Sequence, residues 1–497
     1  MSLGPREEIF VSRSRTFLLL ALLAAYALAF QGARGLWSPD EGRYVDVAIE
    51  MLRTRDWLHP FLHPEVPHYT KPPLTYWAIA SSIAVFGRNE WAARLPNSIA
   101  YLGTVLLLAS LGRHFLPRRP WLPALVYATF AGPFLAANVV NTDTILTFWE
   151  TLGASAFVAW WSAPPTPRRT AFVLGMWTAF GFAFLTKGPP GLLPLVAFVA
   201  FVAFRERARL PGLFHPVGIG LFVVVGATWY VAVALSRPEL WSRFLEDEVV
   251  ARVATGKHHR NSEWYGAFLV YGPMLLVGAL PWVVSALGKM RVKGLRSRLR
   301  DERNVLLGLW LTLPTLVFLL SRSRLPLYVL PLFVPLALVA ARSLPDEWPQ
   351  RPLTRTLLGA WVVVLVGIRG AASLPSLPHK DDRTFARELE RLLTARPREV
   401  VFVGTQARYG LSLYLDTDVE LCDLEPPASP VPYRETLEHE LAEKDHVEPR
   451  VFVAPRYAAD DVGSLLAAWN PGTRLLGYAD GLAVWAGPES ASSPRGK

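Results

Sequence analysis

The sequence has very little cysteine and little charge for its length. Of its 497 residues only one is a cysteine, Cys422, which excludes an intrachain disulfide, a zinc knuckle and an iron–sulfur site. We expect Cys422 to be a small core residue. Charged residues make up 19% of the chain and hydrophobic residues 52%, whereas soluble domains carry about 25% charged residues. This composition excludes a wholly soluble enzyme and a disordered chain.

The chain also lacks the motifs of nucleotide and nucleic-acid binding. No GxGxxG or P-loop pattern occurs in its C-terminal part, and no DNA- or RNA-binding motif accompanies the net charge of +10. The positive charge is concentrated in the first 372 residues, whereas residues 373–497 are net acidic. The basic residues form short runs between apolar segments, which is typical of membrane topology.

Long apolar runs dominate the first 370 residues and predict a polytopic α-helical membrane protein with about 11–13 transmembrane helices. A shorter run, Leu74–Phe86, follows two prolines, and we expect it to lie at the membrane interface or to re-enter. With eleven spans and this non-spanning helix, every strong basic cluster falls on the cytoplasmic side. The eleven runs are Thr16–Phe30, Pro96–Leu111, Trp121–Val140, Thr144–Trp161, Ala171–Leu185, Gly191–Phe204, Val217–Leu235, Ala267–Leu287, Val305–Leu320, Leu325–Ala341 and Leu357–Ile368.

This pattern divides the chain into two domains. Residues 1–372 form the membrane domain, in which residues 32–96 are a first outer loop with interfacial helices. Residues 373–497 form a small outer α/β domain with a disordered tail from Pro488 to Lys497. Its expected elements are an amphipathic helix at Phe385–Leu393, buried strands at Val400–Val403 and Val451–Val453, and a hairpin around Asp480-Gly481. No internal repeat is evident.

The first outer loop begins with the segment Ser38-Pro39-Asp40-Glu41-Gly42-Arg43-Tyr44. An amphipathic helix follows, with Val47 and Met51 on its apolar side and Asp46 and Glu50 on its polar side. We expect this helix to lie on the membrane surface. The Ser-x-x-Glu spacing with a proline at the first helical position also has a purely structural interpretation, which is a capping box.

Two lysines stand at unusual places for a charged side chain. Lys71 precedes two prolines at the outer interface, where a fixed ammonium group suits a phosphate, although a snorkelling lysine is an alternative. Lys187 lies where two apolar runs meet. An ionisable group there costs a few kcal/mol unless it is paired or solvated, which indicates a function or a partner.

Two arginines, Arg322 and Arg324, lie on the outer side against the positive-inside rule, which indicates an anion to bind. Together with the lysines, they gather several cations on the face that also carries Asp40 and Asp143. The cations would hold a lipid-linked phosphate leaving group. A carboxylate would accept the proton of an attacking hydroxyl group.

Five short motifs in this order resemble the aminoarabinose transferase family of lipid A modification, one of the GT-C glycosyltransferases, with the protein O-mannosyltransferases as cousins. The resemblance covers about the first 340 residues. It implies a GT-C membrane enzyme that takes a sugar from a polyprenyl phosphate on the periplasmic side. The motifs are Ser-Pro-Asp-Glu-Gly-Arg-Tyr (38–44), Lys-Pro-Pro-Leu-Thr-Tyr-Trp (71–77), Leu-Thr-Lys-Gly (185–188), Trp-Tyr-Val-Ala (229–232) and Ser-Arg-Leu-Pro-Leu-Tyr-Val-Leu-Pro (323–331).

The resemblance also implies roles for single residues. Asp40 matches the catalytic aspartate of the family, Arg43 its nearby arginine and Asp143 the second acidic site. Lys187 matches the lysine of the Leu-Thr-Lys-Gly motif. The positions that resemble those holding the lipid phosphate are Lys71, Arg252 and Tyr328.

Two departures from the family pattern concern positions implicated in metal binding. Thr70 stands where the family has glutamate, and Val249 stands where it has histidine after the loop glutamate, Glu248. The sequence therefore predicts no certain cofactor and leaves a divalent metal open, with Asp40 and Glu248 as candidate ligands. We also expect a different donor sugar.

We therefore predict a glycosyltransferase of the bacterial inner membrane, with its site on the periplasmic side. It would move a monosaccharide, with inversion, from a polyprenyl phosphate to lipid A, another envelope glycan or a protein hydroxyl. Asp40 would be the general base or would orient the acceptor, and Lys71 with Arg322 or Arg324 would neutralise the leaving phosphate. A flippase for a lipid-linked sugar is an alternative that favours an internal repeat. A non-catalytic envelope scaffold is another.

Overall fold

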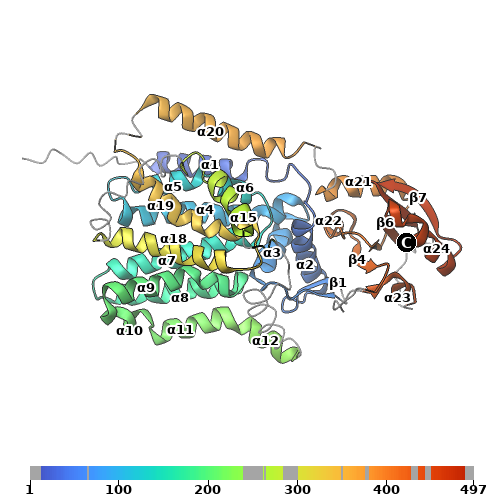
Figure 1. Cartoon of the computed structure of the whole chain (residues 1–497), viewed down its shortest axis with the longest axis horizontal. Helices are drawn as coiled ribbons and strands as arrows, with labels where there is room; N and C mark the ends of the chain where they lie inside the picture. The colour runs from blue at the N-terminus through green and yellow to red at the C-terminus, as the bar shows by residue number, and fades with distance from the viewer. Residues whose placement is uncertain are drawn as a thin grey trace, which may run out of the picture.

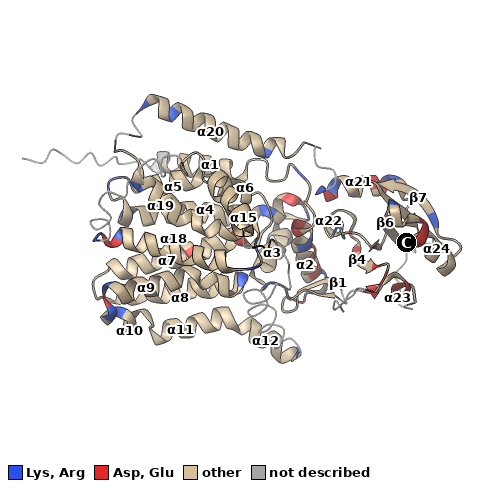
Figure 2. Ribbon diagram, in the orientation of Figure 1, with Lys and Arg blue, Asp and Glu red and all other residues tan. Residues whose placement is uncertain are grey.

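A computed structural model describes residues 13–63, 66–238, 261, 263, 265–283, 300–346, 348, 351–374, 380–426, 435–442 and 449–486. It has a helical bundle, formed by the described residues between 13 and 371, and an α/β domain beside one end of the bundle (Figure 1). Charged residues gather near the two ends of the bundle and on the α/β domain, and the band between the ends contains few of them (Figure 2).

In its described part, each of the eleven predicted apolar runs contains a helix or consecutive helices. The run Trp121–Val140 is divided between α5 (Leu122–Ala128) and α6 (Ala131–Ala136). The run Gly191–Phe204 forms the end of η1 (Pro189–Leu192) and α9 (Leu193–Arg205), and the run Leu325–Ala341 forms η5 (Pro326–Leu332) and α19 (Phe333–Ser343). The others are α1 (Arg13–Leu28), α4 (Glu90–Phe115), α7 (Thr142–Ser162), α8 (Pro167–Lys187), α11 (Pro216–Phe222) with η3 (Val223–Ala227) and α12 (Thr228–Ser236), α15 (Gly266–Gly278), α18 (Glu302–Leu320) and α20 (Pro352–Ala371).

In the part of the chain that the structure describes, six helical segments are long and apolar enough to cross a membrane. They are Glu90–Phe115, Pro167–Lys187, Pro216–Ser236, Glu302–Leu320, Pro326–Ser343 and Pro352–Ala371. Four shorter apolar helices accompany them: Thr16–Leu28, Leu74–Phe86, Pro189–Arg205 and Gly266–Gly278. Large apolar side chains such as Leu235, Leu320 and Val363 are exposed on these helices, as expected for a surface in contact with lipid.

Hydrogen bonds join the basic clusters at one end of the bundle. Arg119 donates to the carbonyl oxygen of Pro345 at 2.7 Å, and Arg342 donates to that of Phe115 at 2.7 Å. Arg209, next to η2 (Arg207–Arg209) and α10 (Leu210–Leu213), donates to the carbonyl oxygen of Trp161 at 3.0 Å. These contacts agree with the single basic side that the sequence predicts.

The first outer loop forms α2 (Asp40–Thr54), a small hairpin of β1 (Phe61–His63) and β2 (Val66–Pro67), and α3 (Leu74–Phe86). With 13 residues, α3 is about 20 Å long, which is shorter than the roughly 30 Å hydrocarbon core of a bilayer. Its length fits the expected interfacial helix.

Two expectations for α2 are wrong. The capping box does not form, because Ser38 Oγ donates to Asp382 while the Glu41 carboxylate is bound by Arg34 and Arg94. Part of the polar side of α2, with Asp46 and Glu50, does not face water either. Asp46 is only 4% exposed, because the C-terminal domain covers it. Charge-assisted bonds to partners distant in sequence replace the local cap.

The C-terminal domain contains a six-stranded mixed sheet in the order β5-β4-β3-β6-β8-β7, with apolar clusters on both faces. The strands β5, β4, β3 and β6 are parallel, whereas β8 is antiparallel to its neighbours β6 and β7. The strands are β3 (Glu399–Val403), β4 (Asp418–Asp423), β5 (Glu435–Thr436), β6 (Arg450–Pro455), β7 (Arg474–Ala479) and β8 (Leu482–Ala486). The helices are α21 (Asp382–Leu392), α22 (Leu411–Leu415), α23 (Leu437–Ala442), η8 (Arg456–Ala458) and α24 (Ala459–Trp469).

The predicted elements of this domain are confirmed. The expected amphipathic helix is α21, the two buried strands lie within β3 and β6, and the hairpin around Asp480-Gly481 joins β7 to β8. Cys422 is completely buried in β4, as expected for a core residue. The segment Pro488–Lys497 lies outside the described residues.

Candidate active site

A polar cavity of about 300 Å³ lies at the end of the bundle nearest α2. It brings together segments that are far apart in the sequence: the start of α2, the loop before α3, the start of α7, the end of α8 and the segment that leads into η5. Six predicted site residues line it, namely Asp40, Arg43, Lys71, Asp143, Lys187 and Tyr328.

Asp40 is the first residue of α2, and its carboxylate is 63% exposed. Among the described residues its hydrogen-bond partner is Arg43, one helical turn later, whose guanidinium donates at 2.6 Å. The carboxylate therefore remains accessible to a molecule in the cavity, with a positive charge beside it.

The carboxylate of the next residue, Glu41, is buried and firmly held, in contrast to the exposed carboxylate of Asp40. It pairs with Arg34 at 2.5 Å and Arg94 at 3.0 Å, and it accepts a hydrogen bond from the backbone N–H of Val140 at 2.8 Å. Burial opposes the ionisation of Glu41, but the two guanidinium groups outweigh it and lower the pKa of this carboxyl to about 2. This ionised group ties α2 to the segment before α7.

Lys187 and Asp143 form an ion pair whose side chains are only 4% and 8% exposed. Asp143 lies in the first turn of α7, where Asn141 caps the helix by accepting a hydrogen bond from the N–H of Thr144. Lys187 is the last residue of α8, and its Nζ lies 4.0 Å from the centroid of the Tyr328 ring. A helix N-terminus and a helix C-terminus thus present opposite charges to each other.

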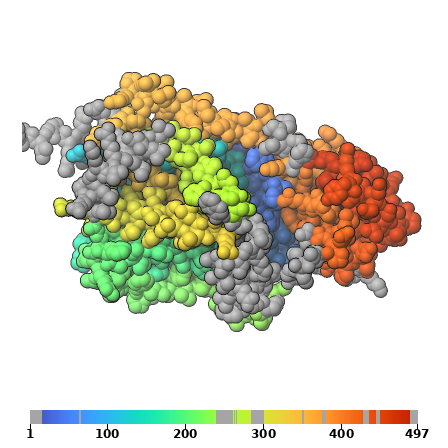
Figure 3. Space-filling model, in the orientation of Figure 1, coloured from blue at the N-terminus to red at the C-terminus, as the bar shows by residue number. Residues whose placement is uncertain are grey.

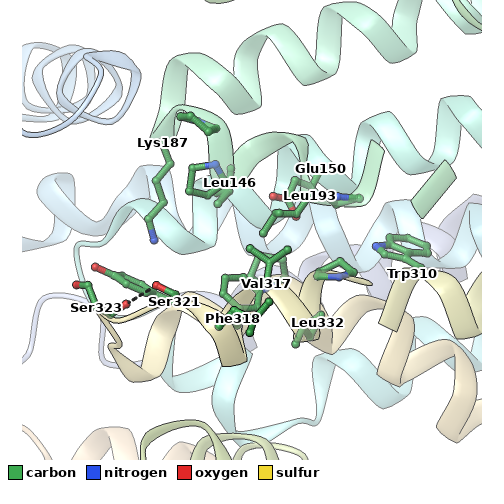
Figure 4. Close-up of a pocket in the computed structure, with 17 residues that line it drawn as sticks. Leu146, Glu150, Lys187, Leu193, Trp310, Val317, Phe318, Ser321, Ser323 and Leu332 are labelled. Carbon is green, nitrogen blue, oxygen red and sulfur yellow. Dashed lines mark hydrogen bonds between the residues drawn. The ribbon is translucent and has the colours of Figure 1, made fainter. Parts of the chain in front are cut away.

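A second cavity, of about 340 Å³ and lined mainly by apolar side chains, begins where the polar one ends. Lys187, Ser323 and Tyr328 line both cavities. Figure 4 shows Lys187 and Ser323 at one end of the apolar cavity and Trp310 at the other. Lining residues between them come from α7, α9 and α18, and include Leu146, Leu193 and Val317.

Among the lining residues that the sequence interpretation did not assign to the site are His68, Thr70 and Glu150. His68 and Thr70 line the polar cavity, and the His68 ring nitrogen lies 2.9 Å from the Thr70 hydroxyl oxygen. Glu150 lies two turns after Asp143 on α7, is 3% exposed and lines the apolar cavity. Glu150 could have been found from the sequence, because it is an acidic residue in the middle of an apolar run.

The structure does not bring every predicted cation to the site. Arg322 is exposed and lines neither cavity. Arg324 is buried, but its guanidinium donates to the carbonyl oxygens of Asn261 and Glu263, both at 2.7 Å. These bonds engage part of the guanidinium with the backbone, and the phosphate role of Arg324 stays a prediction. Arg252 and Glu248 lie outside the described residues.

The residues described at the polar cavity do not assemble a metal site. Asp40 accepts from Arg43, and position 70 carries a hydroxyl that bonds to His68. Within the described ranges, the one cluster with suitable donor atoms is Glu420, Cys422 and Glu440 in the C-terminal domain. The guanidinium of Arg450 forms an ion pair with Glu440 in this cluster, which makes it a structural charge cluster. We therefore derive no step through a metal.

Comparison with known proteins identifies relatives of the membrane domain. Residues 70–230 match a family described as dolichyl-phosphate-mannose-protein mannosyltransferase. The chain is 32% identical over 344 residues to undecaprenyl phosphate-α-4-amino-4-deoxy-L-arabinose arabinosyl transferase 2 of Pseudomonas fluorescens, covering 67% of this chain and 61% of that protein. It is 34% identical over 348 residues to the corresponding transferase of Pseudomonas aeruginosa, covering 67% and 60%. The matched stretch thus spans about three fifths of the relatives' own length.

A solved structure shares the whole fold. The crystal structure of ArnT from Cupriavidus metallidurans bound to undecaprenyl phosphate superimposes with a TM-score of 0.76 and 18% sequence identity. The superposition covers 96% of this chain and all of that one. The chain therefore has the GT-C architecture, in which a helical membrane domain carries a small C-terminal α/β domain.

Proposed function

We propose that this relative of the aminoarabinose transferases is a membrane glycosyltransferase that moves a monosaccharide from a polyprenyl-phosphate donor to an acceptor. The observation that carries the proposal is the junction of the two cavities at Lys187 and Tyr328. A donor of this class has an apolar chain, a phosphate and a sugar in that order. The junction offers an apolar lining, a cation and a polar space with a carboxylate in the same order.

The parts of the donor find matching surroundings. The prenyl chain would enter the apolar cavity between α7, α9 and α18, where burial of each CH₂ group contributes about 0.8 kcal/mol. The phosphate would lie at the junction, close to Lys187, and Lys71 lines the polar cavity on the other side. The sugar would then occupy the polar cavity beside Asp40 and Arg43.

The reaction would be a direct displacement at the anomeric carbon. The acceptor oxygen forms a bond to this carbon while the bond from carbon to the phosphate oxygen breaks, which inverts the anomeric configuration. Lys71 and Lys187 stabilise the negative charge that develops on the departing polyprenyl phosphate. Asp40 takes the proton of an acceptor hydroxyl group, or orients the acceptor where that acceptor is itself a phosphate.

The acceptor belongs to the same compartment as the site. The basic clusters at the opposite end of the bundle support a cytoplasmic position for that end, and the polar cavity and the C-terminal domain would then face the periplasm of a bacterial inner membrane. Acceptors of this compartment include lipid A, other envelope glycans and protein hydroxyl groups. The names of the relatives support an undecaprenyl-phosphate donor.

The test is sugar transfer by the purified protein in detergent. The protein is incubated with a panel of undecaprenyl-phosphate monosaccharides and an envelope-lipid extract, and released undecaprenyl phosphate is followed by mass spectrometry. We expect release by the wild type and a decrease of about 10²–10⁴-fold in Asp40→Asn with a hydroxyl acceptor. Asp461→Asn, an exposed aspartate on α24, is the matched control. Donor binding without release from any donor would contradict transfer and favour a flippase.

A further inference from the structure

The C-terminal domain holds the segment that immediately precedes Asp40. The backbone N–H of Ser38 donates to the carbonyl oxygen of Lys380 at 2.9 Å, and the N–H of Asp382 donates to that of Leu36 at 2.9 Å. The Ser38 hydroxyl donates to the Asp382 carboxyl group, with oxygen–oxygen distances of 2.7 and 2.9 Å. Figure 3 shows the two parts in contact, with the blue N-terminal segment against the orange C-terminal domain.

The packing at this contact leaves no space for side chains at two glycines. A Cβ atom on Gly42 would lie 2.5 Å from the backbone nitrogen of Gly410 and 2.9 Å from Asp382 Oδ2. A Cβ atom on Gly410 would lie 2.3 Å from the same Oδ2. Asp382 itself is completely buried. The start of α2 therefore has a fixed position relative to the C-terminal domain.

Asp40 depends on this contact for its own position. Among the described residues its carboxylate bonds to Arg43, which belongs to the same helix turn, and no membrane helix holds it. The backbone on its N-terminal side is fixed by residues 380–382, whereas the bundle holds the following residue, Glu41, through Arg34 and Arg94. A shift at Ser38 would therefore move the Asp40 carboxylate, and misplacing a reacting group by about 1 Å can cost about 10²-fold in rate.

We propose that Asp382 is a positioning residue that holds Asp40 through Ser38, so that the C-terminal domain completes the active site. This inference rests on the proposed transferase function. The domain would therefore act on the rate of the chemical step, whereas the donor's chain and phosphate would be bound by the bundle and the junction. The kinetic signature is a lower kcat with a nearly unchanged KM for the donor.

The surroundings of Asp382 should also make kcat depend on pH. Burial raises the pKa of this carboxyl to about 7, although Ser38, the Arg408 charge and the Gly410 N–H favour its ionised form. Two charged groups act on the Asp382 carboxyl: Arg408, which pairs with Asp480, and Asp381, which precedes it in the chain. The residue of α2 that packs against this carboxyl is Gly42, which has no charge. The ionised carboxylate accepts from both Ser38 and Gly410, so it holds Ser38 better than the neutral acid, and kcat should rise with pH through about 7.

The experiment measures kcat and KM of the full-length protein between pH 5.5 and 8.5 for the wild type, Asp382→Asn, Ser38→Ala and Ser38→Thr. Asp418→Asn is the control, because it removes another contact of the same domain, the ion pair of Asp418 with Arg53 at the far end of α2. Thermal unfolding in detergent and binding of undecaprenyl phosphate show whether each variant is folded.

We expect Asp382→Asn and Ser38→Ala to lower kcat at pH 8 about tenfold, which corresponds to the loss of one hydrogen bond to a charged group, with KM within twofold. Asp382→Asn should also lose the rise of kcat near pH 7, and Ser38→Thr should restore the wild-type rate. Unchanged kcat in both variants of an active protein would overturn the inference alone. An equal loss of kcat in Asp418→Asn would also overturn the inference. A wild type that transfers no sugar would refute the proposed function, and the inference with it.

Discussion

Lys187 and Asp143 form a buried ion pair where the polar and apolar cavities meet. The lysine ammonium group has three donors, so it can hold Asp143 and still contact a phosphate oxygen. The pair thus places a cation at the boundary between lipid-like and water-like surroundings, where each charge needs the other. The acidic partner also fixes the direction of the lysine side chain before a donor arrives.

Breaking this pair should affect stability and donor binding differently. We expect Lys187→Met and Asp143→Asn each to destabilise the protein by about 3–5 kcal/mol, because each leaves an uncompensated buried charge. The double variant should recover most of the stability but should still bind undecaprenyl phosphate weakly, because the cation is absent. Thermal unfolding in detergent, with and without undecaprenyl phosphate, measures both effects. Single variants with wild-type stability would contradict the structural part of this prediction.

Filling the apolar cavity should weaken the binding of long-chain donors. Leu193→Trp introduces a large ring into the cavity, and excluding two to three carbons of the prenyl chain costs about 2 kcal/mol, or about 30-fold in affinity. Val196→Trp, on the same helix but 54% exposed on its outer side, is the control and should bind normally. Binding of undecaprenyl phosphate and of a short-chain analogue is measured for both variants. Equal affinities for the long chain would exclude this cavity as its site.

The buried Glu41 should make stability depend on pH in the acid range. Its folded-state pKa of about 2 lies below the ordinary value of 4.5, so its contribution is complete above pH 4.5 and is lost as the pH falls towards 2. Glu41→Gln should therefore destabilise the protein at neutral pH by on the order of 3 kcal/mol and flatten this dependence. Glu206→Gln removes the surface pair with Arg209 and should cost less than about 1 kcal/mol. Unfolding midpoints of the three proteins at pH 3 to 7 provide the measurement.

The parts of the fold that were predictable depend on local patterns. Apolar runs of sufficient length predicted the long apolar helices that the structure describes in the bundle, because the bilayer requires a continuous hydrophobic segment whatever its neighbours are. The short alternating and apolar segments of the C-terminal domain predicted α21, β3, β6 and the last hairpin for a similar reason. The residue types at helix ends also indicated charged residues of the polar cavity, such as Asp143 and Lys187, since a charged group at such a place needs a partner.

The errors concern residues whose partners lie far away in the sequence. Ser38 and Glu41 have the spacing of a local cap, but Asp382, 344 residues after Ser38, and Arg94, 53 residues after Glu41, bind them instead. Arg324 also has distant partners, because its guanidinium donates to the carbonyl oxygens of Asn261 and Glu263. The local spacing of residues does not show that a distant partner will replace a local one.

The amino-acid sequence by itself determined that this protein is a bundle of membrane helices with a small α/β domain and a polar site at the helix ends. These features follow from hydrophobic burial, and the segments to be buried can be recognised from composition and periodicity over short stretches of sequence. Only the tertiary structure decided which charges face the cavity and which are used to hold the chain. Charge-assisted hydrogen bonds require contact within about 3 Å, and only the folded chain brings groups such as Ser38 and Asp382 that close.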